Sequence, residues 1–309
     1  MTAPEVNSQS LHELGSNYSV RNNDWAEFSR KKGAILVVGH GTRNPLGAAQ
    51  LRDLVAQMQA KLPMATVRGS FLELAEPSIE QSINDLASLG SQSILVVPVL
   101  LFSAAHAKQD IPDAVKQASA PVGIEIIGQT ESLGTHPSVL ELSGTRFQEI
   151  QDLQNARCCP AGSCARVRCL SNQCESQGVP LGRIGLAMVG RGTSDQAALD
   201  HMRRLTSMHI KNIGLDTYAT GFFAGGTPNV DGLLDQASQW DCDTVVVQPH
   251  LLFEGELMDQ LRSKVLSRQQ MHPTKRWLIA RSLGADPLLA NVFLDLAYEQ
   301  LPKNEPKKA

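Results

Sequence analysis

Residues 34–47, AILVVGHGTRNPLG, run from five apolar residues into a glycine, a histidine and a second glycine, followed by residues that favour turns. An unbroken apolar run of this kind is typical of a strand buried on both faces in a parallel sheet. His40 therefore falls at the carboxyl end of the first predicted strand. Because ligands of open parallel sheets bind outside that edge, His40 is a candidate functional residue.

The alternation of apolar strand and amphipathic helix continues along the chain. Three more buried strands are predicted at 65–74, 93–102 and 124–128. Helices are predicted at 46–62, 77–90 and 110–119. Pro77 and Gly90 suit the first turn and the end of the second helix. This order predicts an α/β domain with a parallel sheet.

The same pattern then returns at a constant offset. VVGHGTRN at 37–44 aligns with MVGRGTSD at 188–195, a shift of 151 residues, and Pro98 and Phe102 align with Pro249 and Phe253 at the same shift. LGTHP, from residue 133, aligns with LGADP, from residue 283, at a shift of 150. We therefore expect two tandem copies of one parallel-sheet α/β unit.

The repeat predicts a pseudo-dimer within one chain, in which the second copy closes the cleft of the first and lends shape rather than ligands. The expected divisions are a flexible amino-terminal segment at 1–32, a catalytic domain at 33–153, a cysteine-rich linker at 154–181, a degenerate second domain at 182–303 and a tail at 304–309.

Composition and charge are those of an ordinary soluble globular protein. The 309 residues are 42% hydrophobic and 19% charged, with a formal net charge of −3, so we expect no nucleic-acid partner. The amino terminus has no apolar core of the kind a signal peptide needs, and no later run approaches the roughly 18 apolar residues of a membrane span. These features predict a cytoplasmic protein without a membrane partner.

The two copies also act as an internal control, because residues that the fold needs should recur and residues that perform chemistry need not. Gly39, Gly41, Thr42, Pro77, Pro98 and Phe102 recur as Gly190, Gly192, Thr193, Pro228, Pro249 and Phe253. His40, Glu73, Glu76 and His106 become Arg191, Ala224, Thr227 and Leu257. The first copy alone thus carries two imidazoles and two carboxylates after three neighbouring strands, where they can face one cleft.

Imidazole binds first-row divalent ions and also accepts protons near neutral pH. Two histidines and a glutamate could hold zinc for hydrolysis, or pass a metal onward while accepting protons. The chain has no HExxH motif and no GxxxxGK[ST] phosphate loop, which disfavours a zinc hydrolase and an ATP-driven process. Asn44 stands where a dinucleotide fingerprint needs glycine.

The segments GHGTRNPLG, FLELAEPSI and LLFSAAHAKQDIP resemble the signature segments of the CbiX-type class II chelatases. GRGTSD, LLFEGELMDQL and LGADP resemble the degenerate carboxy-terminal half of the long, two-domain members. The resemblance implies insertion of Co²⁺ or Fe²⁺ into sirohydrochlorin without ATP, for cobalamin or siroheme. It makes His40 and His106 the active-site histidines that bind the metal, with Glu73 and Glu76 as acidic partners. A non-catalytic tetrapyrrole or metal carrier is the alternative.

Three basic residues are candidates for binding the carboxylates of such a substrate. Arg43 and Lys108 lie near the helix amino termini expected at 42–47 and 110–112, and Arg191 replaces His40 in the second copy. The alternative for each is a solvated surface side chain. His250, which replaces Val99, is expected in the core or the cleft wall, with a role at the site as the alternative.

Five of the six cysteines fall in CCPAGSCARVRCLSNQC, residues 158–174. Cys159, Cys164, Cys169 and Cys174 are spaced five apart, which does not line one face of a helix. A loop around an iron–sulfur cluster or another metal is one hypothesis. Redox-sensing thiols and an unstructured linker are the others.

Overall fold

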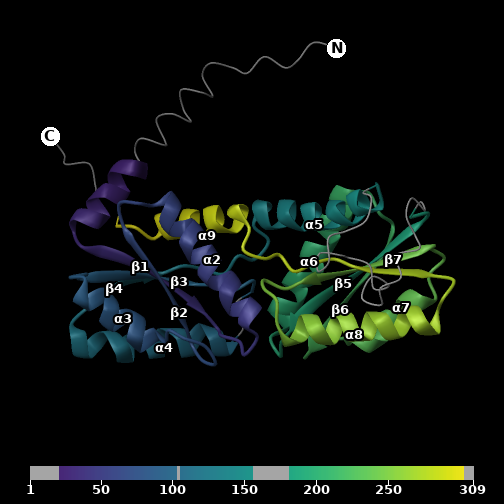
Figure 1. The fold of residues 1–309 in the computed structure, drawn as a ribbon, viewed down its shortest axis with the longest axis horizontal. Helices are drawn as coiled ribbons and strands as arrows, with labels where there is room; N and C mark the ends of the chain where they lie inside the picture. Colours follow the sequence, from purple (N-terminus) through teal and green to yellow (C-terminus); the bar gives the residue numbers. More distant parts are fainter. Residues whose placement is uncertain (1–20, 103–104, 156–180, 303–309) are drawn as a thin grey trace, which may run out of the picture.

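The computed structural model describes residues 21–102, 105–155 and 181–302; the side chains of 105–108 and 153–155 are outside the description. Within these ranges the chain forms two four-stranded sheets that lie end to end (Figure 1). Every pairing in both sheets is parallel. The predicted fold of two tandem parallel-sheet α/β units is confirmed.

The first sheet has the strand order β2-β1-β3-β4. Its strands are β1 (Gly33–Gly39), β2 (Thr66–Phe71), β3 (Ser93–Pro98) and β4 (Glu125–Gln129). The intervening helices are α2 (Pro45–Lys61), α3 (Ile79–Ser88) and α4 (Ala105–Ser119), with a 3-10 turn at Ala120–Val122. All seven residues of β1 are buried, as the unbroken apolar sequence predicts.

The second sheet repeats this order as β6-β5-β7-β8. Its strands are β5 (Ile184–Gly192), β6 (Thr217–Ala224), β7 (Thr244–His250) and β8 (Arg276–Ile279). Its helices are α6 (Gln196–Ile213), α7 (Val230–Ser238) and α8 (Glu256–Met271). Sequence repeat and strand order therefore describe the same duplication.

The last helix of each copy packs on the other copy. Helix α5 (Pro137–Asn155) follows β4 in sequence but packs against α6 and β7, whereas α9 (Pro287–Glu299) follows β8 but packs against α2 and β3. Helices α2, α9, α5 and α6 form one layer along both sheets (Figure 1). One apolar core runs under this layer, from Leu51 of α2 to Met188 of β5, and it joins the two halves.

A buried arginine holds the segment through which the chain crosses back. Arg146 of α5 is 2% exposed and donates to the carbonyl oxygens of Ser282, at 3.2 Å, and Leu283. Its guanidinium also pairs with Asp286, which caps α9, and with Glu149, each at 2.9 Å. Every one of these partners is an acceptor, so the buried charge is compensated.

Two predicted helix starts differ from the structure. Pro77 does not open α3: it follows a cis peptide bond, and Ser78 caps the helix by accepting from the Gln81 amide at 3.2 Å. Helix α4 begins at Ala105 rather than 110, because the helix runs through Pro112, which suits a helix start and hides the preceding turn in the sequence. The helix amino terminus expected at 110–112, near Lys108, is therefore wrong.

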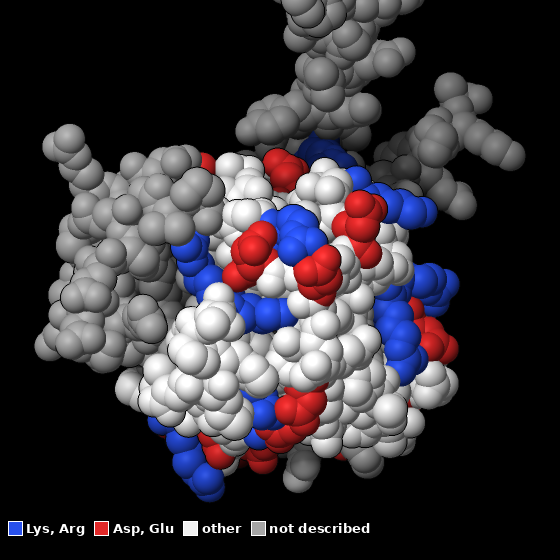
Figure 2. Space-filling model, turned by 90° about the vertical axis from the view of Figure 1, so that its right-hand side faces the viewer, with Lys and Arg blue, Asp and Glu red and all other residues white. Residues whose placement is uncertain are grey.

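The end of the molecule formed by the second half carries acidic and basic side chains in alternation, with uncharged surface between them (Figure 2). The ion pairs of this half include Lys264–Asp231 at 2.7 Å and Arg268–Asp235 at 2.9 Å. Within the ranges described, none of the helices combines the length and the apolar character needed to cross a membrane.

Candidate functional site

His40 and Glu73 meet at the carboxyl edge of the first sheet. Nε2 of His40 lies 3.2 Å from Oε1 of Glu73, and the two side chains are 43% and 53% exposed. His40 follows β1 and Glu73 follows β2, which are neighbours in the sheet. The predicted convergence of these two residues is therefore observed, and their solvent-open positions leave the imidazole accessible to a ligand.

Backbone contacts fix the turn that carries Glu73 to the end of β1. The amides of Leu72 and Glu73 donate to the carbonyl oxygens of Gly39 and His40 at 2.9 and 3.0 Å. Gly41 has φ +109°, and a β-carbon there would lie 1.7 Å from the Glu73 carbonyl oxygen. Only glycine permits this approach, which explains why Gly41 recurs as Gly192, with φ +78°.

The turn ends in a cis peptide bond between Glu76 and Pro77, matched by Thr227–Pro228 in the second half. Oε2 of Glu76 accepts from the Ser78 amide at 3.1 Å, next to the amino terminus of α3. This contact gives Glu76 a helix-capping position, in contrast to the contact of Glu73 with His40. Within the turn, Leu74 has φ +63°.

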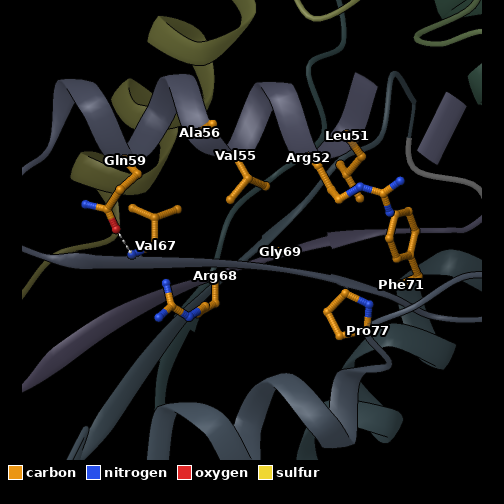
Figure 3. A pocket seen from close by; sticks show the side chains of 10 residues that line it. All are labelled: Leu51, Arg52, Val55, Ala56, Gln59, Val67, Arg68, Gly69, Phe71 and Pro77. Atoms are coloured by element: carbon orange, nitrogen blue, oxygen red, sulfur yellow. Dashed lines mark hydrogen bonds between the residues drawn. The ribbon is translucent and has the colours of Figure 1, made fainter. Parts of the chain in front are cut away.

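An arginine supports the same turn from outside. Nη1 of Arg52 donates to the Glu76 carbonyl oxygen at 3.5 Å, and Nη2 of the matching Arg203 donates to that of Thr227 at 3.2 Å. Arg52 lines a pocket of about 240 Å³ between α2 and β2, beside Phe71 and Pro77 (Figure 3). The contact recurs in the second half, which has no counterparts of the candidate site residues His40, Glu73 and Glu76. It therefore belongs to the fold.

His106 is the second residue of α4, so it lies in the first turn of a helix rather than in a loop. The side chains of His106 and Lys108 are outside the described part of the structure. Strand β3, which leads to α4, is the other neighbour of β1, and the Val99 amide donates to the Val38 carbonyl oxygen at 2.8 Å. The chain therefore leaves the sheet toward His106 beside the strand that presents His40.

The second half contacts this segment through two histidines. The ring of Phe102 lies 6.4 Å from that of His201 in α6 and 5.8 Å from that of His250 in β7, centroid to centroid. His250 is buried, as predicted, and burial lowers the pKa of its imidazole to about 3. This contact was not predicted from the sequence. The available signal was that both histidines replace non-histidine residues, Gln50 and Val99, of the first copy.

Arg43 and Arg191 are exposed, after β1 and at the end of β5. At the amino terminus of α2, the side-chain oxygen of Asn44 already accepts from the Leu46 and Gly47 amides at 2.9 and 3.3 Å. These two amides are therefore already hydrogen-bonded within the protein. The guanidinium of Arg43 is a better candidate than the helix amino terminus for binding an anionic group of a ligand.

Within the described side chains, no group of three or more His, Cys, Asp or Glu residues is arranged to hold a metal ion. Cys159, Cys164, Cys169 and Cys174 lie outside the described residues. The metal chemistry available at the described edge therefore rests on His40 with Glu73.

Comparison with known proteins adds the family. The CbiX family model matches residues 34–150 and 185–300. A sirohydrochlorin cobaltochelatase of Priestia megaterium is 25% identical over 269 residues, covering 87% of this chain and 80% of the relative. A sirohydrochlorin ferrochelatase of Bacillus subtilis is 25% identical over 274 residues, covering 89% and 94%.

Solved structures agree in fold. The structure described as SirB from Bacillus subtilis with Fe³⁺ has a TM-score of 0.68 at 24% identity, covering 87% of this chain and 95% of that one. A sirohydrochlorin chelatase SirB from Bacillus subtilis subspecies spizizenii, in complex with cobalt, has a TM-score of 0.65 at the same identity and coverage.

Proposed function

Because this chain belongs to the CbiX family, with one match in each half, we propose that it is a sirohydrochlorin chelatase that inserts Co²⁺ or Fe²⁺ without ATP. Two relatives that match most of this chain are named as a sirohydrochlorin cobaltochelatase and a sirohydrochlorin ferrochelatase. The observation that carries the proposal is the contact between His40 and Glu73. This pair lies in the first half, which also contains His106, and the second half has Arg191, Ala224 and Leu257 at the matching positions.

The residues suit the chemistry of insertion, in which the ion loses water and two pyrrole nitrogens lose protons. His40 and His106 bind the incoming metal through imidazole nitrogen and accept pyrrole protons. Glu73 orients His40 through the contact at 3.2 Å and takes up a proton in turn. Glu76 has the weaker claim to such a role, since it accepts from the Ser78 amide.

The substrate is a polycarboxylate, and the exposed guanidinium groups of Arg43 and Arg191 are proposed to bind its rim, with Lys108 as a third cation. The pseudo-dimer is proposed to act as a monomer in the cytoplasm, without nucleic-acid or membrane partners. We keep 33–153 as the catalytic unit and 182–303 as the degenerate one, with 1–32, 154–181 and 304–309 as flanking and linking segments.

An iron–sulfur cluster on Cys159, Cys164, Cys169 and Cys174 remains a separate proposal, supported by their even spacing alone. Iron and acid-labile sulfide measured on anaerobically purified protein test it. Loss of both in Cys164→Ser would support a cluster, and thiol titration without bound iron would favour redox-sensing or unstructured thiols.

The function is tested by an anaerobic absorbance assay of sirohydrochlorin with Co²⁺ or Fe²⁺, comparing the protein with His40→Ala and His106→Ala. We expect turnover above the spontaneous rate, lost in both variants, and the ratio of the two rates identifies the preferred metal. Stoichiometric binding without acceleration would reject the enzyme and establish the carrier.

A further inference from the structure

Two exposed leucines stand at the edge of the sheet that carries His40 and Glu73. Leu74 follows Glu73 directly and is 49% exposed, and Leu46 lies in the first turn of α2 and is 64% exposed. Both therefore keep much of a large apolar side chain in water, Leu74 directly after Glu73 and Leu46 in the helix that follows the turn carrying His40. The exposed part of each side chain contributes nothing to folding, because that part stays in contact with water.

Leu74 is also held in a backbone conformation that leucine disfavours. Its φ of +63° is in the left-handed region, where a β-carbon crowds the backbone. The matching residue of the second half is Gly225, with φ +67°. The turn therefore requires the positive φ but not the leucine, and glycine would supply that φ without strain.

Leu46 is likewise replaced by a smaller residue in the second half, where Ala197 stands at the matching position. The half that has lost His40, Glu73 and His106 has thus also lost both leucines. Residues demanded by the fold, such as Gly41 and Pro77, survive in both halves. The two leucines therefore occur only in the half that carries the candidate site residues. Backbone strain of the kind seen at Leu74 is typical of functional sites, so we expect this residue to serve binding.

We propose that Leu74 and Leu46 form an apolar shelf that contacts the face of the macrocycle, an inference that rests on the proposed function. A tetrapyrrole has an apolar ring face and, in sirohydrochlorin, a rim of carboxylates. A ring lying on the leucines presents its central nitrogens to His40 and Glu73 and its rim to the exposed Arg43. Burial of the leucines against the ring stabilises the complex and not the free protein.

Leu74→Gly tests the shelf because it separates binding from folding. The variant should raise KM and Kd for sirohydrochlorin about fivefold, the effect of removing a half-exposed leucine from a contact. KM for the metal should stay unchanged. The midpoint of urea unfolding should stay the same or rise, since glycine adopts the positive φ freely. Leu46→Ala should also raise KM and Kd for sirohydrochlorin.

The matched control is Leu89→Ala, which removes a leucine that is 60% exposed at the end of α3, on the opposite edge of the sheet. It should leave sirohydrochlorin binding unchanged. An unchanged Kd in Leu74→Gly, or a lower unfolding midpoint, would overturn the shelf. The Kd is measured by absorbance titration of sirohydrochlorin without metal. It therefore tests the shelf even if the wild-type protein binds the macrocycle without inserting a metal. A wild-type protein that does not bind sirohydrochlorin would overturn both proposals.

Discussion

Nε2 of His40 lies 3.2 Å from Oε1 of Glu73, so the histidine that follows one strand is oriented by the carboxylate that follows its neighbour. In the second half this pair is Arg191 and Ala224. A contact of this kind fixes the orientation of the ring, and a ring held in one orientation favours metal binding.

Glu73→Gln should therefore lower kcat for metal insertion by about 10- to 100-fold, because the amide keeps the shape but loses the charge and the capacity to take up a proton. The matched variant Glu76→Gln should change kcat less than about twofold, since its amide oxygen can still accept from the Ser78 amide. Steady-state insertion kinetics check both. Equal losses in the two variants would contradict the assignment of Glu73.

Gly41→Ala and Gly192→Ala form a second matched pair. The new β-carbons would lie 1.7 Å and 1.8 Å from the carbonyl oxygens of Glu73 and Ala224, and both glycines have positive φ. Both variants should lower the free energy of unfolding, by about 2 kcal/mol or more. Only Gly41→Ala should also reduce kcat strongly, because it shifts His40 against Glu73. Urea unfolding and insertion kinetics separate these effects, and similar kcat losses in both variants would refute this explanation.

Much of this arrangement could be predicted from the sequence. The apolar run before His40 marks a buried strand, and the constant shift between the copies separates residues of the fold from those at the candidate site. Other features depend on contacts that the local sequence does not encode. The apolar face of α9 indicates that the helix is covered, but it does not indicate that the cover is α2 of the other half.

The contact of Phe102 with His201 and His250 escaped sequence analysis for the same reason, since it joins residues of different copies. The positive φ of Leu74 was hidden because leucine does not signal it; only Gly225 at the matching position does. The sequence predicts too late a start for helix α4, because Pro112 suits a first turn.

Arg146→Met should destabilise the protein by about 3 kcal/mol, because it leaves the carbonyl oxygens of Ser282 and Leu283 and the Asp286 carboxylate without their buried partner. Arg281→Met removes an arginine that is 55% exposed and paired with Glu149, and should cost less than about 1 kcal/mol. Urea unfolding at one pH compares them. A smaller loss for Arg146→Met than for Arg281→Met would show that this clamp does not hold the crossing segment.

His250 should make stability depend on pH. Its pKa falls from an ordinary 6.5 to about 3 because burial penalises the charged ring, and the neighbouring His209, whose pKa burial also lowers, adds to this. Below pH 6.5 the unfolded chain takes up a proton that the folded protein refuses. The stability contributed by a neutral His250 is therefore complete above pH 6.5 and is lost as the pH falls toward 3.

His250→Val introduces the residue found at the matching position 99. It should remove the contribution of His250 to the pH dependence of the free energy of unfolding. Between pH 6.5 and 4 its free energy of unfolding should fall less steeply than that of the wild-type protein, by up to about 1.4 kcal/mol per pH unit. Carboxylates such as Glu149 titrate in both proteins and cancel in the comparison; burial acts to raise the pKa of Glu149, but the paired arginines outweigh it and lower that pKa. Urea unfolding at pH 7.5, 6, 5 and 4 measures the two slopes. Parallel slopes would mean that the His250 ring accepts a proton in the folded protein as readily as in the unfolded chain.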